Sequence, residues 1–187
     1  MTKTEMKSAI NEAAAEAVSK LTLENLNSLT DSVVEGCLES LNELVNGHAA
    51  AIWIREDKGG EQVLTIACNV GGKGDEVEGV VSQSLDSGLV SKAFNDGETI
   101  CHQGFFKHKE QSTEVDKELG QMTAHQIAAP FELFGKAIGA VTVIQTLAAG
   151  VEKQSEWGFD KSDVDSFNAQ LRIIERLLEL NVIKQLV

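Results

Sequence analysis

The sequence contains no tyrosine, a single proline and only three cysteines, Cys37, Cys68 and Cys101. Three cysteines so far apart argue against a disulfide framework and match no paired zinc motif. The one proline, Pro130, leaves no proline-rich linker between two globular units. At 187 residues, of which 42% are hydrophobic, the chain predicts one domain with helical extensions, held together by an apolar core.

Basic residues are also scarce, because 16 lysines and arginines face 29 acidic residues, for a formal net charge of −13. Nucleic-acid binding needs a basic surface, so we expect no nucleic-acid partner. An anionic membrane surface is disfavoured for the same reason, and no apolar run reaches the ~18 residues that span a bilayer. The amino-terminal segment has no signal-peptide core. These absences predict a cytoplasmic protein without a membrane partner.

Hydrophobic periodicity divides the chain into helical ends and a strand-rich middle. Apolar spacings of three and four predict helices over 5–18, 23–45 and 162–186. Short apolar runs between turn residues predict strands at 50–55, 63–68, 98–101, 126–132 and 137–144, an extended piece at 77–81, and short helices at 87–94 and 114–120. This order predicts an α+β fold with a mostly antiparallel sheet. We expect an amino-terminal helical segment, 1–46, and a sheet-containing domain, 47–187.

Several blocks of the sequence, taken in order, resemble the GAF domain, the small-molecule sensory module of phosphodiesterases, phytochromes and many bacterial regulators. The blocks are a first core strand (51–54), a glycine and apolar helix followed by glycine-glutamate and a strand (88–94, then 97–100), a central hairpin (127–131 and 135–143), and Phe159 with Asp163 opening the last helix. The resemblance implies a GAF/PAS-like antiparallel sheet of about six strands, with the long terminal helices packed on one face and a ligand pocket on the other.

The alternation of side chains along 137–144 agrees with this arrangement. Two sets of apolar or small residues lie on opposite faces of that strand: Ile138, Ala140, Thr142 and Ile144 on one, and Gly139, Val141 and Val143 on the other. A strand that is apolar on both faces must be covered on both faces.

The ligand pocket is predicted to be mostly apolar, with few polar groups. Its candidate lining residues are large or polar groups near the covered face: Trp53, Phe94, Phe105, Phe106, Met122 and His125.

The terminal helices carry more apolar residues than one small sheet can bury, and the last helix continues this pattern to Leu186. We therefore expect a homodimer formed through these helices. The predicted function is a non-enzymatic sensory protein in signal transduction, in which binding of an unidentified small molecule shifts the packing of the helices. A separate signalling protein is a further candidate partner, and no cofactor is assigned. A competing hypothesis is a structural dimerisation or protein-interaction module whose pocket is filled by its own side chains.

Some side chains could bind a chromophore or a metal ion. Cys101-His102 resembles the bilin-attachment pair of phytochromes, but Cys101 ends a predicted strand and lies 26 positions before Ile127. The residues His102, His108 and His125, with Cys68 and Cys101, lack the spacing of metal ligands.

Two further activities of GAF relatives match the sequence incompletely. Reduction of free methionine sulfoxide needs an activated and a resolving thiol within reach, so a thiol-dependent reductase would require Cys68 and Cys101 on neighbouring strands. The motif for cyclic nucleotides is interrupted at Gln145-Thr146 and at Val164.

Overall fold

The computed structural model describes residues 2–72, 76–104, 115–116, 120, 122–147 and 158–186. Over these residues the helices are α1 (Lys3–Ser19), α2 (Leu23–Leu29), α3 (Ser32–Leu44), α4 (Leu89–Asp96) and α6 (Lys161–Leu186). The strands are β1 (Ala49–Lys58), β2 (Glu61–Gly71), β3 (Ser82–Ser84), β4 (Ile100–His102), β5 (Thr123–Leu133) and β6 (Lys136–Thr146). The α+β class is confirmed.

The strands form one six-stranded sheet in the order β3-β2-β1-β6-β5-β4, and all neighbouring strands are antiparallel. Two long hairpins, β1–β2 and β5–β6, supply its centre. Their turns, Gly59-Gly60 and Phe134-Gly135, have positive φ at both residues, the geometry that matches the twist of the flanking strands. The predicted six-stranded antiparallel sheet is confirmed.

The central strands β1 and β6 approach most closely at Gly139. A Cβ atom at this position would overlap the carbonyl oxygen of Trp53 on the neighbouring strand. Glycine is therefore required here because a side chain would push the two strands apart.

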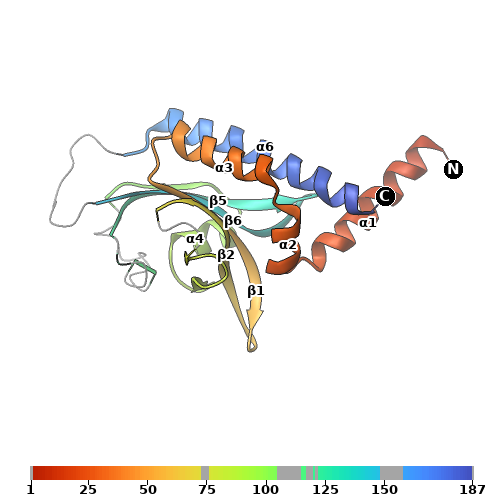
Figure 1. The fold of residues 1–187 in the computed structure, drawn as a ribbon, viewed down its shortest axis with the longest axis horizontal. Coiled ribbons are helices and arrows are strands. Elements are labelled where there is room, and N and C mark those ends of the chain that lie inside the picture. The colour runs from red at the N-terminus through yellow and green to blue at the C-terminus, as the bar shows by residue number, and fades with distance from the viewer. Residues whose placement is uncertain are drawn as a thin grey trace.

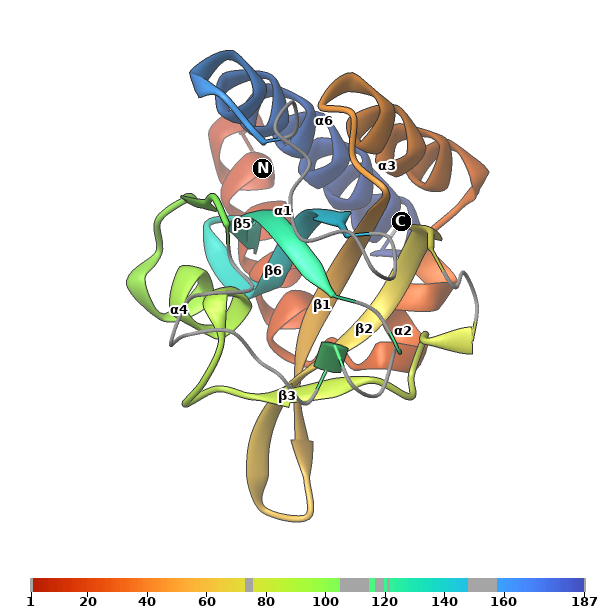
Figure 2. The ribbon, with the colours of Figure 1, turned by 90° about the vertical axis from the view of Figure 1, so that its left-hand side faces the viewer.

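Helices α3 and α6 cover one face of the sheet, while α4 lies on the opposite face (Figures 1 and 2). The helix-covered face forms the larger apolar core, in which Leu38, Ile52, Ile127, Val141 and Ile174 are completely buried. Helix α1 reaches this core through Ala14 and Val18, and its amino-terminal end projects beyond the rest of the molecule (Figure 1).

The predicted helix over 23–45 is wrong in one respect, because it breaks into α2 and α3 at Thr30 and Asp31. The Asp31 carboxylate accepts hydrogen bonds from the backbone N–H groups of Val33 and Val34, both at 3.1 Å. Asp31 therefore caps a new helix. The apolar spacing is continuous across this break and does not predict it.

The extended piece predicted at 77–81 is also wrong. Gly79 has a φ of 71° and the Val81 N–H donates to the Val77 carbonyl at 3.1 Å, so the segment is a turn and the strand begins at Ser82. The short helix predicted at 114–120 lies mostly outside the described residues. Among the helices that the structure describes, none is long and apolar enough to cross a membrane.

The last helix begins at Lys161, one residue before its predicted start. The Asp160 carboxylate accepts from the Asp163 N–H at 3.0 Å, and the Asp163 carboxylate accepts from the Asp160 N–H at 2.8 Å. This reciprocal pair satisfies two backbone donors at the start of α6. Asp163 therefore has a capping role.

Candidate ligand pocket

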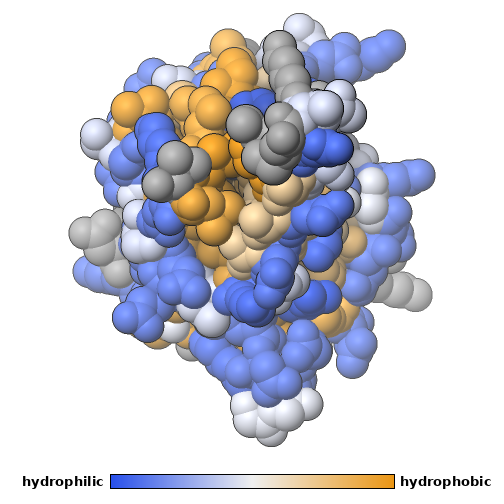
Figure 3. Space-filling model, turned by 90° about the vertical axis from the view of Figure 1, so that its right-hand side faces the viewer, coloured by the Kyte–Doolittle hydropathy of each residue, from blue (hydrophilic) through white to orange (hydrophobic). Residues whose placement is uncertain are grey.

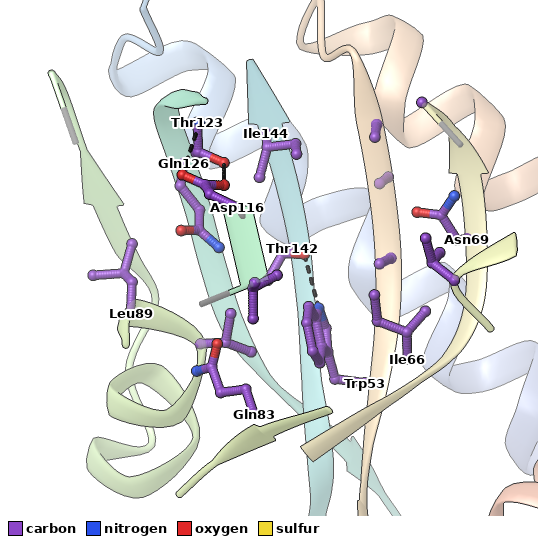
Figure 4. Close-up of a pocket in the computed structure, with 17 residues that line it drawn as sticks. Trp53, Ile66, Asn69, Gln83, Leu89, Asp116, Thr123, Gln126, Thr142 and Ile144 are labelled. Atoms are coloured by element: carbon purple, nitrogen blue, oxygen red, sulfur yellow. Dashed lines mark hydrogen bonds between the residues drawn. The ribbon is translucent and has the colours of Figure 1, made fainter. Parts of the chain in front are cut away.

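A hollow lies on the face of the sheet opposite α3 and α6. It holds about 690 Å³, counting the part that opens to solvent. Strands β1, β2, β5 and β6 form its floor, and α4, β3 and the turn after β2 form its wall (Figure 4). Its apolar lining includes Ala49, Ala51, Trp53, Ile66, Val77, Leu89, Val90, Val115 and Ile144, and its polar lining Asn69, Gln83, Asp116, Thr123, Gln126 and Thr142.

The registers of the strands explain why these residues meet. Ala51 pairs with Thr142, and Ala49 pairs with Ile144, which in turn pairs with Gln126. Residues that pair directly across neighbouring strands point to the same face of a sheet. The alanines of β1 are short, so they leave space above the middle of the floor.

Trp53 borders this space and is only 4% exposed. Its indole Nε1–H donates to the Thr142 hydroxyl oxygen at 3.1 Å (Figure 4). A buried tryptophan needs a partner for this N–H, and Thr142 supplies it from the adjacent strand. The bond fixes the ring as a rigid apolar part of the pocket.

The wall at α4 depends on Gln83 and Gly88. The Gln83 amide Nε2 donates to the Ser87 carbonyl at 2.9 Å and to the Ser91 hydroxyl at 2.8 Å. Gly88 has a φ of 87°, and a Cβ atom there would lie 2.6 Å from Gln83 Nε2. Glycine thus permits both the backbone conformation and the close approach of Gln83 to the beginning of α4.

Asp116 and Thr123 form a second polar pair. The Asp116 carboxylate accepts from the Thr123 N–H at 3.1 Å and from the Thr123 hydroxyl at 2.7 Å. Both residues are at least nine-tenths buried. The pair ties the segment at 115–116 to the start of β5.

The structure brings one predicted lining residue, Trp53, into the pocket. Phe94 packs against the apolar cluster that contains Trp53 and Val90 but does not line the hollow. The Arg55 guanidinium lies 6.0 Å from the centre of its ring. Met122 is 50% exposed and does not line it. Phe105 and Phe106 lie outside the described residues.

His125 also does not line the hollow. Its Nδ1 accepts from the Gly104 N–H at 3.3 Å. Partial burial lowers the pKa of His125, because burial penalises the charged imidazolium. The neutral imidazole of His125 therefore anchors the loop after β4 by accepting this hydrogen bond.

Sequence reasoning missed the polar lining residues Gln83, Asp116, Gln126 and Thr142. The alternation along 137–144 places Thr142 on a face with Ala140 and Ile144, and that signal is sufficient to find it. The sequence places Gln126 in a strand, but the pattern there does not identify its face. Gln83 and Asp116 reach the pocket only through the tertiary fold.

The three cysteines all lie on the helix-covered side, away from the pocket. Cys68 is buried in the larger core, and Cys37 and Cys101 pack against it. Cys68 is on β2 and Cys101 on β4, with β1, β6 and β5 between them. Four strand spacings separate them by roughly 19 Å. Burial, and next the Asp163 carboxylate, raise the pKa of the Cys101 thiol, which opposes thiolate formation.

The metal site considered from the sequence finds no support in the described part of the chain, where no three histidine, cysteine or acidic side chains converge as ligands would. His102 and Cys101 are neighbours on the short edge strand β4. His108 falls outside the described residues.

No family model matches the sequence and no curated protein matches it significantly. Solved structures with a similar fold are known. A GAF domain/HD domain protein from Geobacter sulfurreducens is 14% identical, with a TM-score of 0.63 over 89% of this chain and 100% of that chain. The GAF domain of a phosphoenolpyruvate-protein phosphotransferase from Acinetobacter is 12% identical, with a TM-score of 0.60 over 95% and 94%.

A type II free methionine-R-sulfoxide reductase from Thermoplasma acidophilum is 18% identical, with a TM-score of 0.59 over 84% of this chain and 95% of that chain. Together these likenesses confirm the resemblance seen in the sequence. The chain has a GAF-like fold, with its pocket on the face opposite the long helices.

Proposed function

We propose that this protein is a sensory module of the GAF type, which binds a small molecule in the pocket and transmits its occupancy to the helical layer. The observation that carries the proposal is the largely apolar hollow beside Trp53, since concave apolar sites with a few polar groups are where proteins hold small ligands. The fold's likeness to GAF domains of larger regulatory proteins supports the same role.

The central strands offer a physical route from the pocket to the helices. Trp53 and Thr142 face the pocket, whereas their chain neighbours Ile52, Val141 and Val143 are buried in the helix-covered core. Because successive side chains of a strand point to opposite faces, a ligand that displaces Trp53 or Thr142 also moves the floor beneath α3 and α6. Binding then selects between two packings of the helical layer.

The test of ligand binding uses a variant that fills the hollow. Ala51 lies on the floor and is 6% exposed, so Ala51→Leu places a larger apolar side chain in the ligand's space. Screening a small-molecule library by melting temperature should find compounds that stabilise the natural protein but not Ala51→Leu. A library that stabilises both proteins equally, or neither, would contradict pocket binding.

We also propose that the protein acts as a homodimer through the outer surface of α3 and α6. This outer helical surface consists of Val33, Cys37 and Leu44 on α3 with Ile173, Leu177 and Leu180 on α6. Four of these six residues, Val33, Leu44, Ile173 and Leu180, are 49–56% exposed. Apolar side chains repeated at heptad-like spacing on two adjacent helices favour packing against the same surface of a second copy.

Charge and neighbouring surface support a second copy as the occupant. Helix α3 exposes Glu35, Glu39 and Glu43, while α6, which carries both signs of charge, exposes Arg172 and Arg176, so a two-fold arrangement allows the α3 carboxylates to face these arginines. Apolar residues also gather on the side where α1 and the end of α6 lie (Figure 3). Ile10, Leu180 and Leu186 are exposed on those two helices.

Leu180→Asp tests the dimer, because an aspartate at the centre of the interface would be desolvated without a partner. Sedimentation analysis should show a dimer for the natural protein and a monomer for Leu180→Asp. Val80→Asp is the matched control, since Val80 is 65% exposed and lies in the turn before β3, which adjoins α2 and is part of neither α3 nor α6. A natural protein that sediments as a monomer at tens of micromolar would refute this part of the proposal.

A thiol-dependent reductase is the competing function that the Thermoplasma likeness brings forward. The separation of Cys68 from Cys101 by three strands, and their position away from the pocket, favour a non-enzymatic role. We therefore propose that Cys101→Ser leaves any sulfoxide reduction by the purified protein unchanged at background level. All three cysteines are free thiols, as is usual in reducing compartments, and this supports a cytoplasmic location.

A further inference from the structure

Gln126 is a pocket-lining polar side chain to which the described part of the protein offers no hydrogen-bond partner. It is 6% exposed, lies on β5 and lines the pocket, and its carboxamide points into the hollow (Figure 4). Within the part of the chain that the structure describes, this carboxamide has no hydrogen-bond partner. An amide that lines a largely apolar hollow without a protein partner is available to pair with a ligand.

The wall at α4 and β3 also offers hydrogen-bonding groups. The backbone N–H groups of Leu89 and Val90 begin α4, whose Gly88 cap supplies no side-chain hydrogen bond, and the first backbone bond within the helix comes from Lys92. Both residues line the pocket. Gln83 uses its amide nitrogen within the wall, which leaves its oxygen as an acceptor. These groups are uncharged donors and acceptors.

The charge of the lining decides between charged and neutral ligands. Asp116 is the one charged side chain among the described lining residues, and its carboxylate is already bound by Thr123. A ligand anion would meet this carboxylate in a site of low dielectric. A ligand cation would compete with Thr123 for Asp116.

We infer that the pocket takes a small uncharged molecule that carries a carboxamide or lactam edge, which pairs with the Gln126 carboxamide above the apolar floor. Such an edge places one donor beside one acceptor, the arrangement that a glutamine side chain matches in a bidentate pair. The inference rests on the proposed sensory function and adds the chemical class of the ligand.

The test compares three probes that share the benzoyl group: benzamide, methyl benzoate and benzoate. Binding is measured by ligand-observed NMR titration of the natural protein, Gln126→Leu and Gln62→Leu. Gln62 is the matched control because it is an exposed glutamine near the end of the β1–β2 hairpin, outside the pocket. Benzamide should bind the natural protein about 10-fold more tightly than methyl benzoate, the effect of one well-placed hydrogen-bonded pair.

Gln126→Leu should remove this preference, by weakening benzamide about 10-fold while methyl benzoate changes less than about two-fold. Gln62→Leu should behave as the natural protein does. Equal binding of all three probes, or tighter binding of benzoate, overturns the amide inference but leaves the pocket as a ligand site. Failure of every probe to bind the natural protein overturns the amide inference, while the library screen with Ala51→Leu decides whether the pocket binds any ligand. The comparison among probes on the natural protein needs no variant, so it holds even where Gln126→Leu fails to fold.

Discussion

The two faces of the sheet are made by the same strands but are completed differently. On the helix-covered face, Ile52, Ile127 and Val141 are fully buried against α3 and α6. On the pocket face, alanines occupy the matching positions of β1, and polar residues such as Thr142 and Gln126 lie among the apolar ones. One face therefore provides stability, and the other gives up packing to leave a hollow.

This difference is a consequence of side-chain volume and polarity rather than of strand geometry. A fully packed face gains free energy from every buried methylene, whereas a hollow forgoes the contacts of the atoms that border it. Under the proposed function, a bound ligand would restore these contacts. The comparison of the two faces can therefore be tested by changing matched residues on each.

The largest loss of stability is expected at Gly139, where the backbones of the central strands β1 and β6 approach most closely. In Gly139→Ala, the added Cβ would overlap the Trp53 carbonyl oxygen, which separates β1 from β6 at the centre of the sheet. We expect a loss of about 3 kcal/mol or more in the free energy of unfolding, or failure to fold, measured by urea denaturation followed by circular dichroism.

Gly36→Ala is the control for this substitution. A Cβ atom at Gly36 has no neighbour within 4 Å, and α3 should gain up to about 1 kcal/mol from alanine in place of glycine. If both alanine variants lose stability equally, the close approach of β1 and β6 is not what requires Gly139.

A matched pair of isoleucines separates the two faces directly. Ile127 on β5 is 0% exposed in the helix-covered core, while Ile144 on β6 borders the hollow and is partly exposed. Ile127→Ala should cost about 2–5 kcal/mol, the range for a cavity in a packed core, and Ile144→Ala about 1 kcal/mol, because few contacts are lost. Urea denaturation of both variants measures the difference, and equal costs would mean that the pocket face is packed as tightly as the other.

Much of the fold could be predicted from the sequence because local patterns and the fold agree in most segments. Alternation in β6 predicts Val141 and Val143 on the face opposite Ala140, Thr142 and Ile144, as the structure has them, but Ile138, predicted with the second set, packs in the larger core instead. The failures came where one polar residue overrides a continuous apolar pattern. Asp31 divides a predicted helix by capping the backbone, an effect that hydrophobic spacing does not register.

The pocket is less predictable than the fold, because large side chains do not by themselves mark where a hollow lies. Large residues were expected around the ligand, and of these Trp53 lines the hollow. A hollow is instead made by small residues such as Ala49 and Ala51, together with buried polar groups whose partners come from distant segments. The hydrogen bond between Asp116 and Thr123 is one such contact, and no spacing in the sequence predicts it.

The hydrogen bond between Trp53 and Thr142 should contribute a smaller amount. Thr142→Val keeps the volume but leaves the indole N–H without its acceptor, at a cost of about 1–3 kcal/mol. In Trp53→Phe the donor is absent, so adding Thr142→Val to that variant should cost less than it does in the natural protein. Urea denaturation of the two single variants and the double variant gives the coupling energy, and a coupling of zero would show that the bond does not stabilise the pocket.

The smallest effect concerns Glu175 on α6, on the helix-covered side. Burial raises the pKa of Glu175 above its ordinary value of 4.5, and the carboxylates of Glu132 and Glu179 raise it further. The hydrogen bond from the Glu132 N–H and the charge of Arg172 act in the opposite direction and lower this pKa. A raised pKa in the folded state means that the stabilisation is complete below about pH 4.5 and is lost as the pH rises through the folded pKa. Glu175→Gln should therefore stabilise the protein at pH 7, by roughly 0.5 kcal/mol or less because water screens the half-exposed group. Urea midpoints from pH 4 to 8 measure this, and a gain that does not shrink toward acid pH would assign the effect to packing instead of charge.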